Sequence, residues 1–351
     1  MWLDVRGHDP VVNRFRRTLA RGRLASTYLF VGPSGVGKRT FALRLAQSLM
    51  CVKSADADLA PCGQCASCVL FAAGNHPDLL LVRKPADKSS LPIELFIGKG
   101  DKRNQEGLCH DLSLRPMVSR RRVAIIDDAD DFNEASANCL LKILEEPPPH
   151  SMIILLGTSL AKQLPTIRSR AQVVRFAMLS NDDVAAILQD RQLLTNGTVA
   201  QDLARRSGGS VAAALAAQDD AVWQFRADLL KQLSAPRFNS VRLAKSVEEF
   251  VKEAGKDAPP RRARLRQIIS FAADLYREVL HTVLAAPELA GNSDPSLTQA
   301  RDQLIAQRAT ANQAIQALQS CLAAEEHVSR NANQSTLIQS WLAELASKLG
   351  R

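Results

Sequence analysis

The sequence GPSGVGKRT occupies residues 32–40 and has the glycine and lysine spacing of a phosphate-binding loop. The apolar run TYLFV at residues 27–31 precedes it and suits a buried strand, and apolar residues at helical spacing follow it. In that context the backbone N–H groups at a helix N-terminus cradle phosphate oxygens, and the lysine reaches the terminal phosphates. The residues expected to bind a nucleotide here are Gly32, Gly35, Gly37, Lys38 and Thr40.

The residue after the lysine departs from the motif. Arg39 stands where Ser or Thr would bind Mg²⁺, and Thr40 comes one residue late. A loop that merely packs a helix on a sheet is the alternative interpretation. We expect a loop descended from nucleotide-binding proteins, with ATP or ADP as an open question. The missing hydroxyl argues against Mg²⁺-dependent hydrolysis.

A second apolar run, at residues 123–126, ends in the acidic sequence Asp127-Asp128-Ala129-Asp130. Asp127 could hold Mg²⁺ through water. An ATPase of this type would usually place glutamate next, as the base for the attacking water. Asp128 is one methylene shorter, and catalysis is sensitive to shifts of about 1 Å. The alternative is that these carboxylates only make local turns at a strand end.

Composition and pattern predict the organisation of the chain. It has 351 residues, 46% of them hydrophobic, and at roughly 100–200 residues per domain that gives two or three domains. The apolar runs at 27–31, 123–126 and 152–156 alternate with helical patterns, which predicts a parallel α/β sheet with flanking helices. Beyond about residue 178 the composition is helical. We expect an α/β domain over 1–178, a small helical unit over 179–218 and an all-helical domain over 219–351.

Four of the seven cysteines lie close together in the sequence: Cys51, Cys62, Cys65 and Cys68. Two-residue spacing lets thiolates point at one tetrahedral metal, and four of them close its coordination shell. We therefore predict a structural Zn²⁺ module over residues 51–68. An iron–sulfur cluster also takes four thiolates, but nothing in the chain suggests electron transfer, so zinc is preferred.

Net charge is +9, which suits a nucleic-acid partner but indicates one only weakly. The basic runs at 120–122 and 261–264 have no interleaved aromatics, and we interpret them first as solvated faces and second as DNA-backbone contacts. No apolar run approaches the ~18 residues of a membrane span. The N-terminus lacks a secretory pattern. We expect a cytoplasmic protein with no membrane partner.

Several of these stretches together resemble the bacterial clamp-loader family of AAA+ proteins, which belong to DNA polymerase III, and its delta-prime branch most. The resemblance is dense over about residues 7–175. It rests on GPSGVGKRT, the cysteine cluster, Asn75-His76-Pro77-Asp78, VAIIDDAD at 123–130, NCLLKILEEPP at 138–148 and LPTIRSR at 164–170. The last two motifs together are quite specific to clamp loaders.

The resemblance implies an AAA+ P-loop module with a zinc-binding insertion, then a helical lid, then a helical collar that assembles a ring. It implies a function in DNA replication, where the ring loads a sliding clamp onto primer–template DNA. The implied partners are the other subunits, of the tau/gamma and delta type, in a hetero-pentameric ring, together with the clamp and the DNA. The chain would be part of a DNA polymerase holoenzyme and of an ATP-driven loader.

The resemblance also implies roles for single residues. Ser169-Arg170-Ala171 matches the family's Ser-Arg-Cys motif except at Ala171, and by that match Arg170 is an arginine finger offered in trans to a neighbour's ATP. Without the resemblance, a solvated or phosphate-contacting arginine would be the simpler interpretation. Thr158 matches the sensor-one hydroxyl. Ala212 stands where motor subunits place an arginine.

Three weakened positions, Arg39, Asp128 and Ala212, point to a ring-completing subunit with little or no ATPase of its own. The first alternative is an ATP-hydrolysing motor subunit of tau/gamma type in the same loader. A more remote alternative is an AAA+ DNA helicase, against which the cysteine cluster and LPTIRSR argue.

Overall fold

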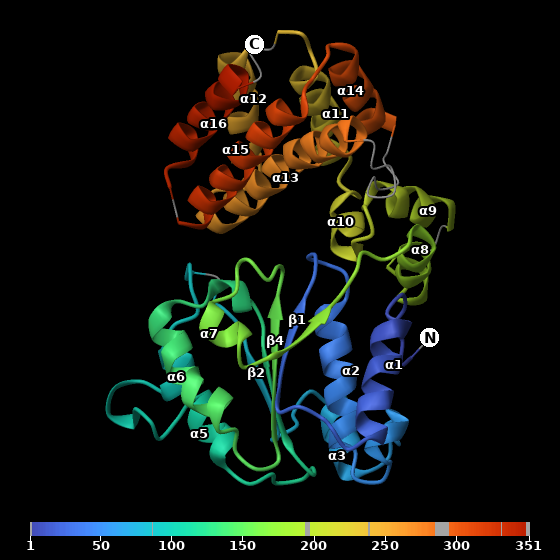
Figure 1. The fold of residues 1–351 in the computed structure, drawn as a ribbon, viewed down its shortest axis with the longest axis vertical. Helices are drawn as coiled ribbons and strands as arrows, with labels where there is room; N and C mark the ends of the chain where they lie inside the picture. The colour runs from blue at the N-terminus through green and yellow to red at the C-terminus, as the bar shows by residue number, and fades with distance from the viewer. Residues whose placement is uncertain are drawn as a thin grey trace. The chain divides into compact units, whose positions relative to one another are not determined.

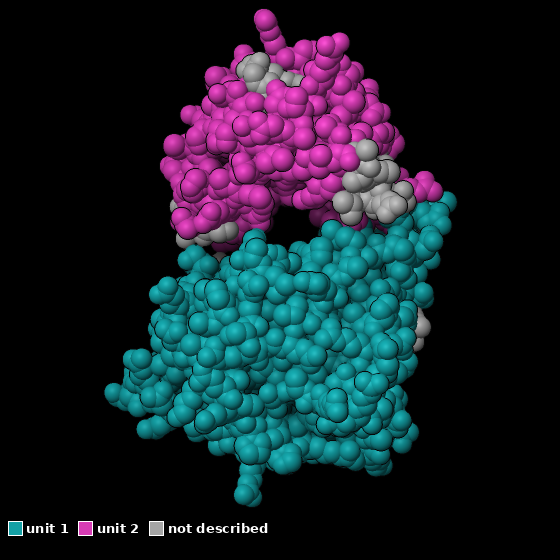
Figure 2. Space-filling view, in the orientation of Figure 1, with its two compact units in different colours: residues 1–201, 209–212 teal, residues 202–208, 213–351 magenta. Residues whose placement is uncertain are grey.

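The computed structural model describes residues 2–85, 87–193, 197–237, 239–284, 295–330 and 332–348. The chain forms two compact units (Figure 2). Unit 1 comprises residues 1–201 and 209–212, and unit 2 comprises residues 202–208 and 213–351. The three-part division expected from the sequence, with boundaries at 178 and 218, stays a prediction.

Unit 1 is built on a five-stranded parallel sheet with the strand order β2-β3-β4-β1-β5. The strands are β1 (Thr27–Val31), β2 (Leu79–Val82), β3 (Arg122–Ile126), β4 (Ser151–Gly157) and β5 (Gln172–Arg175). The sequence predicted β1, β3 and β4, which lie in the middle and are buried almost throughout. It missed the two edge strands, because each has only four residues and is partly exposed.

Helices cover both faces of the sheet (Figure 1). Alternate strand residues point to opposite faces: Phe30 and Ile154 join one apolar cluster, while Leu29 and Ile153 join the other. The helices of unit 1 that pack around the sheet are α1 (Asp9–Ala20), α2 (Lys38–Met50), α3 (Ala66–Ala72), α4 (Glu94–Ile97), α5 (Leu108–Ser113), α6 (Glu134–Glu145) and α7 (Pro165–Arg168). Burial on both faces explains why the central strands are continuous apolar runs.

The rest of the described chain is helical. Three helices follow the sheet: α8 (Asn181–Asp190), α9 (Gly197–Arg206) and α10 (Val211–Ala216). Unit 2 then contains α11 (Asp220–Leu233), α12 (Ser240–Glu253), α13 (Ala258–Val283), α14 (Pro295–Ala306), α15 (Ala311–Ser329) and α16 (Gln334–Lys348). These helices share one apolar core that includes Leu230, Val247 and Leu342. The prediction of a parallel α/β core followed by a helical region is confirmed. Within the described residues, no helix is long and apolar enough to cross a membrane.

Candidate functional site

The predicted phosphate loop connects β1 to the N-terminus of α2, as the motif requires. Gly35 and Gly37 have φ of +76° and +98°, a region that glycine adopts without strain, and α2 begins at Lys38. The Lys38 ammonium donates to the carbonyl oxygens of Gly32 (2.6 Å) and Pro33 (2.7 Å). Burial lowers the pKa of Lys38, and nearby carboxylates oppose that shift. The lysine is thus held by its own loop.

The segment at residues 210–212, 176 residues further along the chain, packs directly on this loop. Ser210 Oγ donates to the Ser34 carbonyl (2.9 Å), and the Val211 N–H donates to the Gly35 carbonyl (3.0 Å). A Cβ added at Gly35 would lie 2.6 Å from that of Ala212, so no larger residue fits there. Ala212, the position at which the resemblance implies an arginine in motor subunits, therefore lies against the phosphate loop and presents only a methyl group.

His8, which the sequence analysis did not single out, supports the loop from the other side. It is buried, and its Nε2 lies 2.7 Å from the carbonyl oxygen of Val36. A carbonyl oxygen can only accept, so Nε2 is the donor, and burial lowers the pKa of His8. A lone histidine before a helix carries no local signal for this contact.

Arg39 forms an ion pair with Asp127 at the end of β3 (2.7 Å). Asp127 is the carboxylate expected to hold Mg²⁺, and Arg39 replaces the hydroxyl expected to bind the same ion. The guanidinium therefore supplies a positive charge to the carboxylate that a metal would otherwise neutralise. The sequence predicted the loss of the hydroxyl but not this pairing.

The neighbouring acidic residues also have partners within the protein. The Asp128 carboxylate accepts from the Lys84 N–H (3.3 Å) at the end of β2. Asp130 accepts from both the N–H and the hydroxyl of Thr158 and from the Gln163 side chain. The predicted sensor hydroxyl of Thr158 thus donates to Asp130. Asp130 is a residue of the site that sequence reasoning passed over, and its presence in VAIIDDAD was the available signal.

Arg170 lies at the opposite end of the strands from the phosphate loop. The phosphate loop, Asp127 and Thr158 follow the carboxyl ends of β1, β3 and β4, whereas Arg170 precedes the amino end of the parallel strand β5. Its guanidinium donates to Glu145 (2.9 Å from Nε) and to the Thr166 carbonyl (3.0 Å). The chain does not bring Arg170 to its own phosphate loop.

The four predicted zinc ligands come together in space. Their sulfur atoms all lie within 4.8 Å of one another, with 3.9 Å between Cys51 and Cys65 and 4.0 Å between Cys62 and Cys68. A Zn–S bond of about 2.3 Å places the sulfurs of a tetrahedral site about 3.8 Å apart. Cys51 follows the end of α2, and Cys65 caps the N-terminus of α3. The geometry and donor set are consistent with a structural zinc site.

Hydrogen bonds to the sulfur atoms support the same interpretation. Burial opposes ionisation of Cys51, but N–H groups of Cys62 and Ser54 donate to its sulfur and lower its pKa to about 5. Burial beside other sulfurs raises the pKa of Cys68 to about 12. Four thiolates so close together repel one another, and a divalent cation removes that repulsion.

We predict one zinc ion per purified chain and a content near zero after Cys65→Ser, because three thiolates leave the coordination shell open. Metal analysis under non-chelating conditions checks this, with Cys109→Ser, outside the cluster, as the control that keeps its metal. The sheet and unit 2 should stay folded in Cys65→Ser, since each has its own core. Wild-type protein with almost no metal would contradict the prediction.

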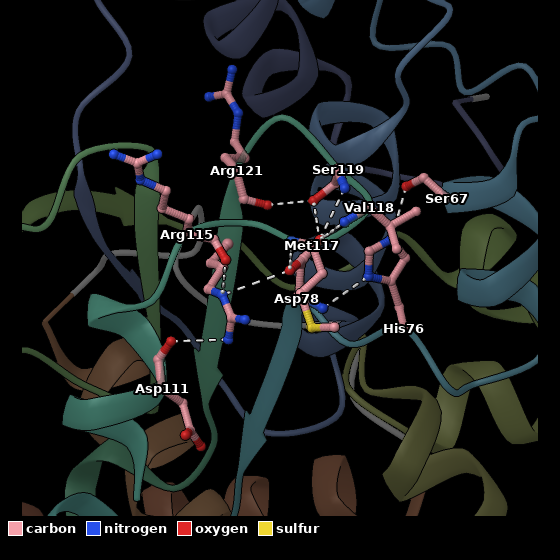
Figure 3. A network of polar contacts seen from close by, with 10 residues as sticks. Ser67, His76, Asp78, Asp111, Arg115, Met117, Val118, Ser119 and Arg121 are labelled. Atoms are coloured by element: carbon pink, nitrogen blue, oxygen red, sulfur yellow. Dashed lines mark hydrogen bonds and ion pairs between the residues drawn. The ribbon is translucent and has the colours of Figure 1, made fainter. Parts of the chain in front are cut away.

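The four-cysteine module at residues 51–68 is tied to the sheet through His76 and Asp78 of the sequence Asn75-His76-Pro77-Asp78 (Figure 3). His76 Nδ1 accepts from the Asp78 N–H (3.1 Å), so its proton lies on Nε2, 2.9 Å from Ser67 Oγ. Ser67 donates in turn to the Met50 carbonyl (2.8 Å). His76 is thus a buried, neutral link between α3, α2 and the strand β2.

Asp78 is fully buried and collects donors from the turn before β3. It accepts from the N–H groups of residues 117–119 at 2.7–2.9 Å and from the Ser119 hydroxyl (3.0 Å). Its charge is paired with Arg122, 3.6 Å away and 5% exposed. Figure 3 shows Met117, Val118 and Ser119 next to the Asp78 side chain.

The interpretation of the basic run at 120–122 as a solvated face is wrong for Arg122, which is buried, whereas Arg120 is exposed and Arg121 is partly buried. Arg120 donates to the Val52 carbonyl (2.6 Å), Arg121 pairs with Asp56, and Arg122 is buried. All three positive charges hold the cysteine insertion and β2 against β3. A run of three arginines gives no sign of this, because Val52, Asp56 and Asp78 lie more than 40 residues away in the sequence.

A parallel sheet of order 2-3-4-1-5, with a phosphate loop after its β1 strand and a helical region after the sheet, defines a P-loop protein of the AAA+ class. Residues 7–180 match the family model described as "DNA polymerase III, delta subunit". Over this region the chain belongs to the DNA polymerase III clamp-loader family.

Individual relatives include both types of subunit. The chain is 37% identical over 210 residues to DNA polymerase III subunit gamma/tau of Mycobacterium bovis, covering 59% of this chain and 34% of the relative. It is 34% identical over 179 residues to subunit delta' of Bacillus subtilis, covering 51% and 50%. It thus spans half the length of these relatives or less. A solved gamma subunit-related protein of Thermotoga maritima superposes with a TM-score of 0.39 at 15% identity, covering 96% of this chain and 99% of that one.

Proposed function

We propose that this chain is a delta-prime-type subunit of the DNA polymerase III clamp loader, with little or no ATP turnover of its own. The observation that carries the proposal is the ion pair between Arg39 and Asp127. A bound Mg²⁺ would need the carboxylate that Arg39 occupies, and phosphoryl transfer in P-loop proteins relies on that metal to neutralise developing charge. ATP or ADP can still occupy the loop as a ligand that is not hydrolysed.

Other contacts support the same proposal. Asp128, where a motor subunit has its glutamate, points its carboxylate to the Lys84 backbone. Ala212 gives the loop no second cation. Each of these features weakens the site independently, and all of them leave the fold intact.

The position of Arg170 supports a role toward a neighbouring subunit. It lies at the opposite end of the strands from the phosphate loop of its own chain, so the ATP it could reach belongs to another subunit. In the ring we propose, the partners are tau/gamma-type and delta-type subunits, and the assembled ring loads a sliding clamp onto primer–template DNA. The zinc module would act as a structural part.

A motor subunit of the same loader is the second candidate. The gamma/tau relative is 37% identical, against 34% for the delta' relative, and the gamma/tau alignment is the longer one. The intact phosphate-loop lysine is compatible with it. The two candidates differ in a single measurable property, the ATP turnover of the isolated chain.

We expect the purified chain to hydrolyse ATP no faster than a blank in the presence of Mg²⁺, DNA and clamp. Lys38→Ala should change nothing, because there is no turnover for the lysine to support. Steady-state phosphate release checks both. Mg²⁺-dependent turnover that Lys38→Ala abolishes would instead identify a motor subunit. Unwinding of DNA strands by the chain alone would support the helicase alternative.

A further inference from the structure

A cavity of about 310 Å³ opens on unit 1 between the C-terminal half of α1 and the edge strand β5. The phosphate loop follows the carboxyl end of β1. The cavity lies at the opposite, amino-terminal end of the strands, where α1 ends and the parallel strand β5 begins. Its lining consists of four arginines and two uncharged polar residues: Arg14, Arg17, Thr18, Arg21, Arg23 and Gln172.

Helical spacing brings these arginines together. Residues 14, 17, 18 and 21 are three or four apart and so share one face of α1, which continues into the turn that carries Arg23. Arg14 is fixed by a hydrogen bond to the Val173 carbonyl of the edge strand (3.2 Å), and Arg17 donates to the Asn13 carbonyl (3.3 Å). The cavity wall is therefore partly pre-organised.

None of the four guanidiniums forms an ion pair with a carboxylate among the residues that the structure describes. Arg21 and Arg23 are exposed. Arginines at the end of a helix can serve simply to stabilise its dipole, worth a few tenths of a kcal/mol. That role suits Arg17 and Arg21, but it does not explain why Arg14 and Arg23 converge on the same cavity.

The chemistry of the lining selects the ligand. A guanidinium presents a planar fork of donors that matches phosphate oxygens and stays charged at every physiological pH. The cavity has no aromatic or aliphatic lining residue, so it offers no anchor point of the kind that peptide partners use. Contacts made only by cations and polar groups are typical of sequence-independent binding to a nucleic-acid backbone.

We propose that this cavity binds phosphate groups of a nucleic-acid backbone directly. The proposal goes beyond the clamp-loader function and does not depend on it, because it concerns the isolated chain and a surface remote from the phosphate loop.

The test measures binding of a fluorescent primed DNA to the full chain by anisotropy, over a series of NaCl concentrations. The variant is Arg17→Ala with Arg21→Ala. The matched control is Arg242→Ala with Lys245→Ala, two exposed residues of α12 whose replacement removes the same charge. Far-ultraviolet circular dichroism and thermal melting verify that both proteins are folded.

We expect the cavity variant to bind at least about tenfold more weakly at low salt. The slope of log K against log salt should fall by about two, one for each lost phosphate contact. The control should change affinity less than twofold and keep its slope. A charge-retaining variant, Arg17→Lys with Arg21→Lys, should lose affinity but keep the slope, and it carries the test if the alanine variant does not fold.

Three outcomes would overturn the proposal. One is equal weakening by both alanine variants, which would mean that only net charge matters. Another is complete displacement of DNA by inorganic phosphate at matched ionic strength, which would make free phosphate the ligand. The last is tighter, arginine-dependent binding of a polyglutamate peptide, which would make an acidic protein segment the occupant.

Discussion

Replacing Arg170 by alanine is expected to slow ATP hydrolysis by a reconstituted clamp loader while leaving the isolated chain unchanged. An arginine finger stabilises charge on the γ-phosphate in the transition state, and its loss typically costs about 10³–10⁵ in rate at the site it serves. Total ATPase should fall by that one site's share of the ring's activity. Clamp loading should fall further if the sites act in concert.

The measurement is DNA- and clamp-stimulated steady-state ATPase of the complex with either form of the subunit. Arg168→Ala is the matched control, since Arg168 is exposed and lies two residues earlier in the same motif. Ring assembly should survive, because Arg170 is on the surface and its Glu145 ion pair contributes little to stability. Unchanged ATPase and loading in an intact Arg170→Ala complex would show that Arg170 is not the finger.

Replacing Asp78 by alanine is expected to destabilise unit 1 by about 3–5 kcal/mol. The change leaves the Arg122 guanidinium buried without its counter-charge, and it leaves the N–H groups of residues 117–119 without their acceptor. Chemical denaturation followed by circular dichroism measures the loss. Asp101→Ala, on an exposed surface turn, is the control and should stay within about 0.5 kcal/mol of wild type.

The same carboxylate should make stability depend on acid pH. Burial disfavours its charge, but the amide hydrogen bonds from Met117, Ser119 and Val118 outweigh burial and lower the pKa of Asp78 below its ordinary value of 3.8. The unfolded chain therefore binds this proton more readily than the folded one. The contribution is complete above about pH 4 and is lost as the pH falls through the depressed folded value. Denaturation of Asp78→Asn should lack this part of the acid-induced loss, and an identical pH profile would contradict the assignment.

Local sequence was sufficient for the central strands and the metal cluster. β1, β3 and β4 are apolar runs buried on both faces, and such runs are visible without knowledge of the fold. Cys62, Cys65 and Cys68 are separated by two residues each, so their proximity is a property of one short segment. The edge strands β2 and β5 were not predicted, because a short, partly exposed strand has no comparable apolar run.

The departures from an ATPase site were also visible in the sequence, but their consequences were not. Arg39 could be identified as a missing hydroxyl, whereas its pairing with Asp127 joins residues 88 positions apart. Which carboxylate meets which cation there depends on β3 lying two strands away from β1, with β4 between them. The Thr158–Asp130 contact likewise depends on β3 and β4 being neighbours.

By itself, the sequence determined the class of fold, the phosphate loop with Arg39 at the metal-binding position, and the cysteine cluster. Each of these depends on residues that are close together along the chain. Only the tertiary structure decided that Arg122 is buried against Asp78, that Arg39 neutralises Asp127, and that the arginines of α1 meet the edge of β5 in a cavity. The physical reason is that charge pairing and burial depend on distance in space, and strand order brings distant segments together without leaving a local pattern in any of them.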